Sequence, residues 1–193
     1  LVLSGNPFMI YLTLLLIMVG FGYKIAMAPF HYWTPDVYEG APTPVTGFFS
    51  VAPKAAGFAI LIRVFYTIFT QSGDLSATNE LANVDWTLII AVLSAVTMTI
   101  GNFLALHQEN VKRMLAFSSI SHVGFMLIGF AVISIESLEA ILFYLVIYIF
   151  MNLSAFIIAI FASNKLNAYN VDDWNGLAVK NPLLAVFMVI SLV

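Results

Sequence analysis

The chain has 193 residues, of which 62% are hydrophobic and only 9% are charged, and its formal net charge at pH 7 is −3. Soluble domains carry about 25% charged residues, so this composition excludes a water-soluble globular domain. Cysteine is absent and the charges form no basic tract, which excludes a disulfide framework, a cysteine-ligated metal site and a nucleic-acid interface.

Long apolar runs predict transmembrane helices, because an α-helix needs about 20 residues to cross roughly 30 Å of hydrocarbon. The predicted fold class is all-α: a polytopic transmembrane helix bundle with five complete spans and a truncated sixth, which together form a single transmembrane domain over 1–193. In chain order the spans are expected at 8–33, 45–69, 86–106, 114–133, 138–162 and 183–193. The chain begins with Leu1 and stops within an apolar run, so we expect both ends to be cut from a longer protein.

The orientation follows from the basic residues, which collect in short cytoplasmic loops. The loops after the third and fifth spans are basic, whereas the loops after the second and fourth spans are acidic and carry no base. The basic residues are Lys112, Arg113, Lys165 and Lys180, and the acidic residues are Asp74, Glu80, Asp85 and Glu136. We therefore expect residue 1 on the outer side of the membrane and the loop 34–44 in the cytoplasm.

Lys24 lies inside the first predicted span, between Gly22 and Pro29. A charged lysine at the bilayer centre costs about 2.5 to 3.5 kcal/mol on insertion scales, so we expect Lys24 to face the bundle interior and to exchange a proton. Gly20, Gly22 and Pro29 weaken the helix around it. These residues predict a broken helix whose free backbone groups are satisfied by protein or water.

Lys54 is a second lysine at membrane depth, preceded by Pro53 in the second predicted span. Small residues flank it and allow close helix packing. The functional interpretation is a proton-carrying site. The structural alternative is that Lys54 extends its ammonium to the interface or pairs with a carboxylate elsewhere.

Two histidines and a polar stripe complete the candidates. His122 lies in the fourth span among serines, and its ordinary pKa near 6.5 suits proton relay, although a role in helix packing is an equal alternative. His31 lies near the cytoplasmic end of the first span, where it could feed a proton path. Tyr144, Tyr148 and Asn152 share one helix face, and Tyr148 is a candidate for the path, with ordinary packing favoured.

Asp36 and Glu39 lie in the loop 34–44 and are interpreted first as solvated turn residues, with a proton entrance or a subunit contact as the alternative. Motifs for nucleotides, metals and nucleophilic catalysis are absent from the sequence. We therefore expect no redox chemistry, no cofactor and no metal in this chain itself.

Three stretches carry a resemblance to a known family: KIAMAPFHYWTPDVYEGAPTPVTGFFSVAPKAAGF, GNFLALHQENVKRMLAFSSISHVGFML and LFYLVIYIFMNLSAF. They resemble the subunit N family of proton-pumping NADH:quinone oxidoreductase, respiratory complex I, whose mitochondrial members are NADH dehydrogenase subunit 2. The resemblance covers nearly the whole chain. It implies an antiporter-like fold with two inverted five-helix repeats, each with a broken helix, and a bacterial inner-membrane location.

By match to the family motifs, Lys24 corresponds to the lysine of the first broken helix, and Lys54 to the lysine that links the proton path to the second half-channel. The resemblance implies proton translocation coupled to electron transfer from NADH to quinone. NADH, FMN, iron–sulfur clusters and quinone would then bind elsewhere in the complex, and the partners would be other membrane-arm subunits and the lipid bilayer.

Related antiporter-like proteins share PTPV and the first lysine, so a subunit of a multisubunit cation/proton antiporter or membrane hydrogenase is the alternative. In those relatives the following helix carries a histidine nearer its start, whereas SVAPKAAGF supplies Lys54 here. A structural membrane module, in which the lysines only pair with acids to hold helices together, is a third hypothesis.

Overall fold

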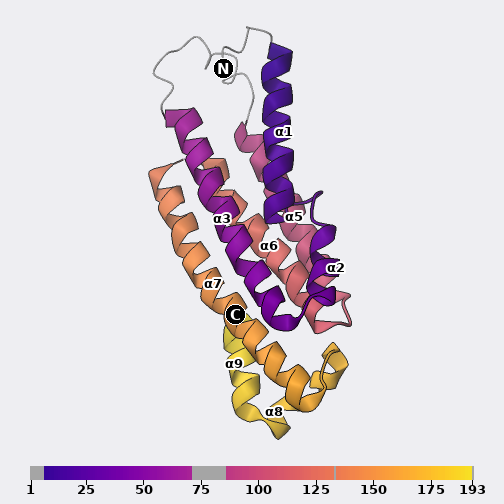
Figure 1. Cartoon of the computed structure of the whole chain (residues 1–193). Helices are drawn as coiled ribbons and strands as arrows, with labels where there is room; N and C mark the ends of the chain where they lie inside the picture. Colours follow the sequence, from indigo (N-terminus) through magenta and orange to yellow (C-terminus); the bar gives the residue numbers. More distant parts are fainter. Residues whose placement is uncertain (1–6, 71–85, 133, 193) are drawn as a thin grey trace.

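The computed structural model describes residues 7–70, 86–132 and 134–192, which form an elongated helical bundle (Figure 1). The elements are α1 (Pro7–Ile25), α2 (Trp33–Gly40), α3 (Thr43–Thr70), α5 (Trp86–Leu106), α6 (Val111–Val132), α7 (Ile135–Leu166), the 3-10 helix η1 (Val171–Trp174), α8 (Leu177–Lys180) and α9 (Pro182–Leu192). Four of these helices, α3, α5, α6 and α7, are long and apolar enough to cross a membrane. The all-α, multi-pass transmembrane fold class is thus confirmed.

The first predicted span, expected at 8–33, is interrupted within its range, as the prediction of a broken helix requires. α1 ends at Ile25, and α2 begins only at Trp33 and continues into the segment expected to be a loop. α2 tolerates Pro35 because this residue lies in the first helical turn, where its missing N–H costs no hydrogen bond. α2 ends at Gly40, and Ala41 is extended (φ −77°, ψ 153°), as a residue before proline prefers.

The first part of the break between α1 and α2, residues 26–28, is buried, and the protein itself satisfies backbone groups there. Ala26 has a positive φ of 63°, and the Ala28 N–H donates to Thr97 Oγ1 of α5 at 3.1 Å. The Trp33 indole N–H donates back across the break to the Tyr23 carbonyl at 3.0 Å. This agrees with the rule that irregular backbone at membrane depth needs partners within the protein. Of the three residues expected to weaken the helix, Pro29 lies in the break, whereas Gly20 and Gly22 lie within α1.

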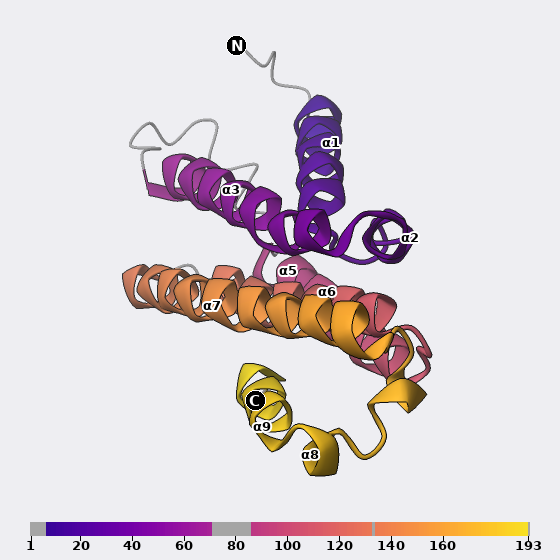
Figure 2. The same ribbon diagram turned by 60° about the horizontal axis from the view of Figure 1, so that its bottom comes forward.

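α6 and α7 connect the bundle. α6 contacts α2, α3, α5 and α7, and α7 lies between α3 and α9 (Figure 2). α2, the start of α6 and the end of α7 gather at one end of the molecule, opposite the start of α1 (Figure 1). The predicted basic loops therefore share one end. Residue 1 and the predicted acidic segment 71–85, on which the orientation also rests, lie outside the described residues.

Glycines allow the backbones of α5 and α6 to come into direct contact. A Cβ at Gly101 would lie 2.6 Å from the Ser121 backbone nitrogen, and a Cβ at Gly124 would lie 2.7 Å from the Met98 backbone nitrogen. The Ser94 hydroxyl donates to the Gly124 carbonyl at 2.7 Å across this interface. Small residues and interhelical hydrogen bonds are the usual basis of helix association in membranes, so α5 and α6 form a close pair.

We predict that Gly101→Ala destabilises the protein by about 1–3 kcal/mol, the usual cost of overpacking, because the new methyl group meets backbone that cannot rotate away. Unfolding of the purified protein by titration with SDS in mixed micelles measures this change. Gly20→Ala is the control, since no heavy atom lies within 4 Å of a Cβ built there. Equal midpoints for the two variants would contradict the packing argument.

Candidate functional site

Lys54 projects from α3 into the bundle and is 1% exposed. Its Nζ donates to the Ser119 hydroxyl of α6 at 2.6 Å. Among the described residues, no carboxylate forms an ion pair with Lys54; the ion pairs found there are those of Arg113. Lys54 therefore does not reach the interface, and its ammonium contacts a neutral group.

Tyr38 of α2 and Ser119 of α6 surround the ammonium of Lys54, and this buried group of three residues is called the Lys54 chamber below. The tyrosine is fully buried, and Lys54 Nζ lies 5.9 Å from the centroid of its ring. On its other side the ring contacts Phe156 of α7 edge-on, with centroids 6.1 Å apart. A cation within about 6 Å of an aromatic face is attracted to the ring, so Tyr38 stabilises an ammonium at this position.

Ser119 is oriented by its own helix, because its hydroxyl donates to the Ala116 carbonyl at 2.6 Å. With that proton engaged, its oxygen is free to accept from Lys54. Sequence reasoning noted Ser119 only as a neighbour of His122, and it did not single out Tyr38. The hydrophobic pattern contains no signal for either contact, since both depend on how α2, α3 and α6 cross.

His122 and the tyrosines of α7 form the neighbouring part of the site. His122 Nδ1 lies 2.7 Å from the Tyr144 hydroxyl, and the His122 ring centroid lies 5.6 Å from that of Tyr148. The Tyr148 hydroxyl donates to the Ser50 carbonyl of α3 at 3.0 Å. Asn152, one turn further along α7, is also buried. The stripe predicted on one face of this helix thus faces the interior and carries polar contacts.

Lys24 lies in the last turn of α1 and is exposed on this chain. That it faces the interior of the complete bundle stays a prediction. α3 is the helix that packs on this end of α1, and a Cβ at Gly57 would meet Ile25 and the Lys24 Cγ at 2.7 and 3.5 Å. The stem of Lys24 is therefore held against α3 while no described helix covers its ammonium.

His31 lies within the break and is 2% exposed. Its ring stacks on Tyr32 with centroids 4.4 Å apart, and its Nδ1 has no hydrogen-bond partner among the described residues. The turn between α1 and α2 folds the imidazole inward, and a role of His31 in a proton path stays a prediction. The structure brings together Lys54, His122 and Tyr148, but it gives neither Lys24 nor His31 a contact with them.

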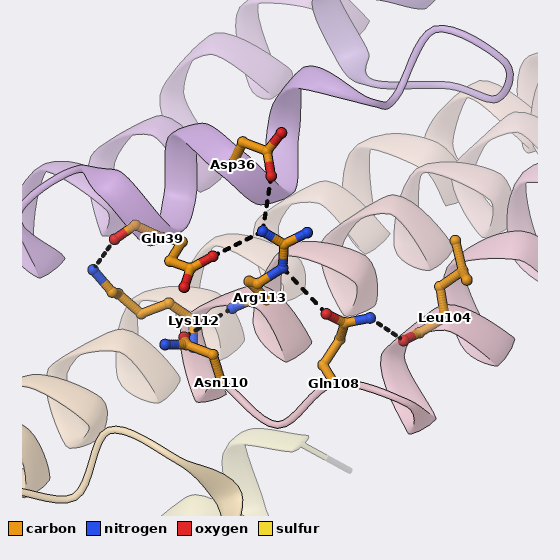
Figure 3. Close-up of polar contacts among 7 residues, drawn as sticks. All are labelled: Asp36, Glu39, Leu104, Gln108, Asn110, Lys112 and Arg113. Carbon is orange, nitrogen blue, oxygen red and sulfur yellow. Dashed lines mark hydrogen bonds and ion pairs between the residues drawn. The ribbon is translucent and has the colours of Figure 1, made fainter.

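Asp36 and Glu39 are more than solvated turn residues. Each carboxylate accepts from Arg113 at 2.8 Å, while Asp36 remains largely exposed. Lys112 donates to the carbonyls of Glu39 and Ala41 at the end of α2. Figure 3 shows the contacts of Arg113 with Asp36 and Glu39 and of Lys112 with Glu39. Together with the bond from Lys112 to Ala41, these contacts fasten α2 to the start of α6.

We predict that Ser119→Ala destabilises the protein by about 1–3 kcal/mol, the cost of leaving a buried polar group without its partner. The loss should shrink in a Lys54→Met background, because the group that needs the hydroxyl is then absent. A double-mutant cycle on thermal unfolding in detergent measures the coupling. Equal losses in both backgrounds would show that the Lys54–Ser119 hydrogen bond contributes nothing, and Ser154→Ala serves as a control because that hydroxyl bonds only within α7.

Comparison with known proteins places this chain in a family. The family model for the transmembrane region of NADH:quinone oxidoreductase and Mrp antiporter proteins matches residues 3–193. NADH-quinone oxidoreductase subunit N 2 of Chloroherpeton thalassium is 49% identical over 180 residues, which are 93% of this chain and 34% of that protein. The subunit N 2 of Sorangium cellulosum is 49% identical over 188 residues, or 97% of this chain and 36% of that protein. The chain thus spans about a third of the length of these relatives.

Solved structures of three respiratory or antiporter complexes contain similar chains. A chain of the archaeal membrane-bound sulfane sulfur reductase superposes with a TM-score of 0.80 at 26% identity and covers 98% of this chain and 37% of that one. Respiratory complex I from Thermus thermophilus gives 0.64 at 32% identity, with 93% and 36% covered. The Mrp complex from Dietzia gives 0.76 at 25% identity, with 94% and 32% covered. The chain therefore belongs to the NADH:quinone oxidoreductase/Mrp antiporter transmembrane family.

Proposed function

We propose that this chain is part of the subunit N of a proton-translocating NADH:quinone oxidoreductase, and that Lys54 carries protons within it. Electron transfer from NADH to quinone occurs in other subunits, which hold the FMN, the iron–sulfur clusters and the quinone. The partners of the chain are other membrane-arm subunits and the lipid bilayer. The location is the bacterial inner membrane, with α2 and the start of α6 on the cytoplasmic side.

The observation that carries the proposal is the buried ammonium of Lys54 opposite a neutral hydroxyl. Charged residues inside membrane segments are costly and usually mark ion or proton pathways. A lysine held only by structural pairing would face a carboxylate, yet the described residues offer Lys54 a serine and an aromatic ring. The site can therefore exist with either protonation state of the amine, which a proton carrier requires.

The surroundings provide groups that can pass a proton. The Ser119 hydroxyl both accepts from Lys54 and donates to a carbonyl. His122 shares a hydrogen bond with the Tyr144 hydroxyl and lies beside Tyr148. Hydroxyl and imidazole groups can each accept one proton and release another. These residues line a polar interior between α3, α6 and α7.

Lys24 belongs to the proposal through its position at the end of the broken helix. Its ammonium is exposed on this chain, and the relatives are about three times as long as the matched segment. We infer that helices of the complete subunit cover this face of α1 and supply the acidic partner of Lys24. His31, buried in the break, lies where a path from the cytoplasmic side would pass.

We predict that Lys54→Met and Lys24→Ala each reduce NADH-driven proton translocation strongly in membrane vesicles that contain the complete complex. Removing one obligatory proton carrier should lower the number of protons moved per NADH oxidised, and coupling should lower the rate of quinone reduction as well. Both rates are measured together, with the amount of assembled complex determined on native gels. Lys165→Ala, which removes an exposed cation at the end of α7, is the control.

Normal proton-to-electron stoichiometry in either lysine variant would remove that lysine from the proposed path. If both variants kept wild-type rates, the lysines would be structural, and the third hypothesis, a module that only holds helices together, would be supported instead.

A cation/proton antiporter subunit is the second candidate, favoured by the 0.76 TM-score with the Mrp complex and by the breadth of the family. The two functions differ in their energy source. Proton movement that needs NADH supports the oxidoreductase, whereas movement that persists without NADH and depends on a sodium gradient supports the antiporter. The 49% identity with proteins named subunit N favours the first.

A further inference from the structure

The outer and inner faces of α2 serve two different contacts. On its outer face, Asp36 and Glu39 both bind the guanidinium of Arg113 at 2.8 Å (Figure 3). On its inner face, Tyr38 lies over the Lys54 ammonium, 5.9 Å from Nζ to the ring centroid. α2 thus contacts both Lys54 and the polar end of the bundle.

The short length of α2 makes its position dependent on these contacts. An isolated helix of fewer than about 12 residues is marginal in water, and α2 has 8. It follows a break and precedes a second one at Ala41, so neither neighbouring helix holds it by continuity. The contacts with α6 and α3 therefore decide where Tyr38 lies.

The start of α6 holds α2 with two cations that act on different groups. Arg113 binds the acidic side chains, and Lys112 donates to the Glu39 carbonyl and, at 3.1 Å, to the Ala41 carbonyl. Free carbonyls at a helix end favour a cation there. Thr46 of α3 adds a third contact, because its hydroxyl donates to the Tyr38 carbonyl at 3.1 Å.

Arg113 is itself held in place. Its Nε donates to Gln108 Oε1 at 3.2 Å, and Gln108 Nε2 donates to the Leu104 carbonyl at the end of α5 at 2.9 Å. A single exposed ion pair stabilises little, but here one oriented guanidinium binds two carboxylates. Charge-assisted hydrogen bonds of this kind orient the bound groups and also stabilise the contact.

The same helix carries the partner of Lys54. Ser119 lies seven residues after Lys112, which is about two helical turns and the same face of α6. α6 thus holds two groups. Ser119 binds the Lys54 ammonium, and Lys112 and Arg113 hold α2, whose Tyr38 covers Lys54. A change at the outer contact would be transmitted to the chamber, because α2 would no longer be held against α6.

We propose that Arg113 and Lys112 are positioning residues for Lys54: by fastening α2 to α6 they hold Tyr38 over the ammonium and close the chamber toward the cytoplasmic end. This inference rests on the proposed function of Lys54 as a proton carrier. The contacts of Arg113 and Lys112 with α2 are called the clamp below. Loosening the clamp opens the chamber to water from the cytoplasmic end. Protons then reach Lys54 without being coupled to electron transfer.

The test measures closure directly, with a thiol placed in α2. Thr34 is fully buried, and Thr34→Cys changes its size little. The assay uses inside-out vesicles with the complete complex, in a background without other cysteines in this subunit. A membrane-impermeant maleimide is applied, and its rate of attachment to the subunit is compared with and without Arg113→Gln.

We expect Arg113→Gln to raise the labelling rate about tenfold or more, which corresponds to about 1.4 kcal/mol of lost closure. Protons translocated per NADH should fall in the same vesicles. Asp36→Asn combined with Glu39→Gln should reproduce both effects from the other side of the clamp. Arg113→Lys, which keeps the charge but loses the planar fork, should restore most of the closure.

Lys165→Gln is the matched control, because it removes a cation from the same end of the bundle without touching α2. An unchanged labelling rate in Arg113→Gln would overturn the proposal whatever happens to translocation. Faster labelling with normal translocation would also overturn it, since α2 would then open without consequence for Lys54. Lys54→Met in the same vesicles tests the proposed function separately: if that variant translocates normally, the role of Lys54 fails while the closure measurement stands on its own.

Discussion

Lys54 places a positive charge in a helix that is long and apolar enough to span a membrane, and it leaves that charge 1% exposed. Such a group persists only where neighbouring elements replace water. Here α6 provides the Ser119 hydroxyl and α2 provides the face of Tyr38. The Lys54 ammonium therefore constrains how α2, α3 and α6 cross, in addition to the contacts of Arg113, Lys112 and Thr46 that hold α2 in place.

The same constraint acts on the backbone between α1 and α2. Backbone groups without a partner are costly at membrane depth. The Ala28 N–H donates to Thr97 of α5, and the Tyr23 carbonyl accepts from the Trp33 indole N–H. The break directs the chain into α2, and α2 delivers Tyr38 to the chamber and its acidic residues to Arg113. The irregular segment thus leads into one short helix, α2. This helix contacts both the buried Lys54 and Arg113 at the polar end of the bundle.

The two lysines proposed for the proton path differ in how the structure places them. Lys54 is buried among α2, α3 and α6, whereas Lys24 is exposed at the end of α1. The contacts of Lys54 are therefore seen within this chain, whereas the role proposed for Lys24 rests on the inference that helices of the complete subunit cover it.

The apolar runs by themselves determined the transmembrane class and the ranges of the main helices. The reason is local, because each residue exposed to lipid pays its own cost for a free backbone group or a charge. α5, for example, covers the range expected for the third span. Local pattern also marked Lys54 and His122 as unusual. Only the tertiary structure decided that the proline-rich segment forms α2, that Asp36 and Glu39 bind Arg113, and that Ser119 accepts from Lys54. These contacts join residues 65 to 77 positions apart, and such pairs are selected by the way helices cross, which no local pattern specifies.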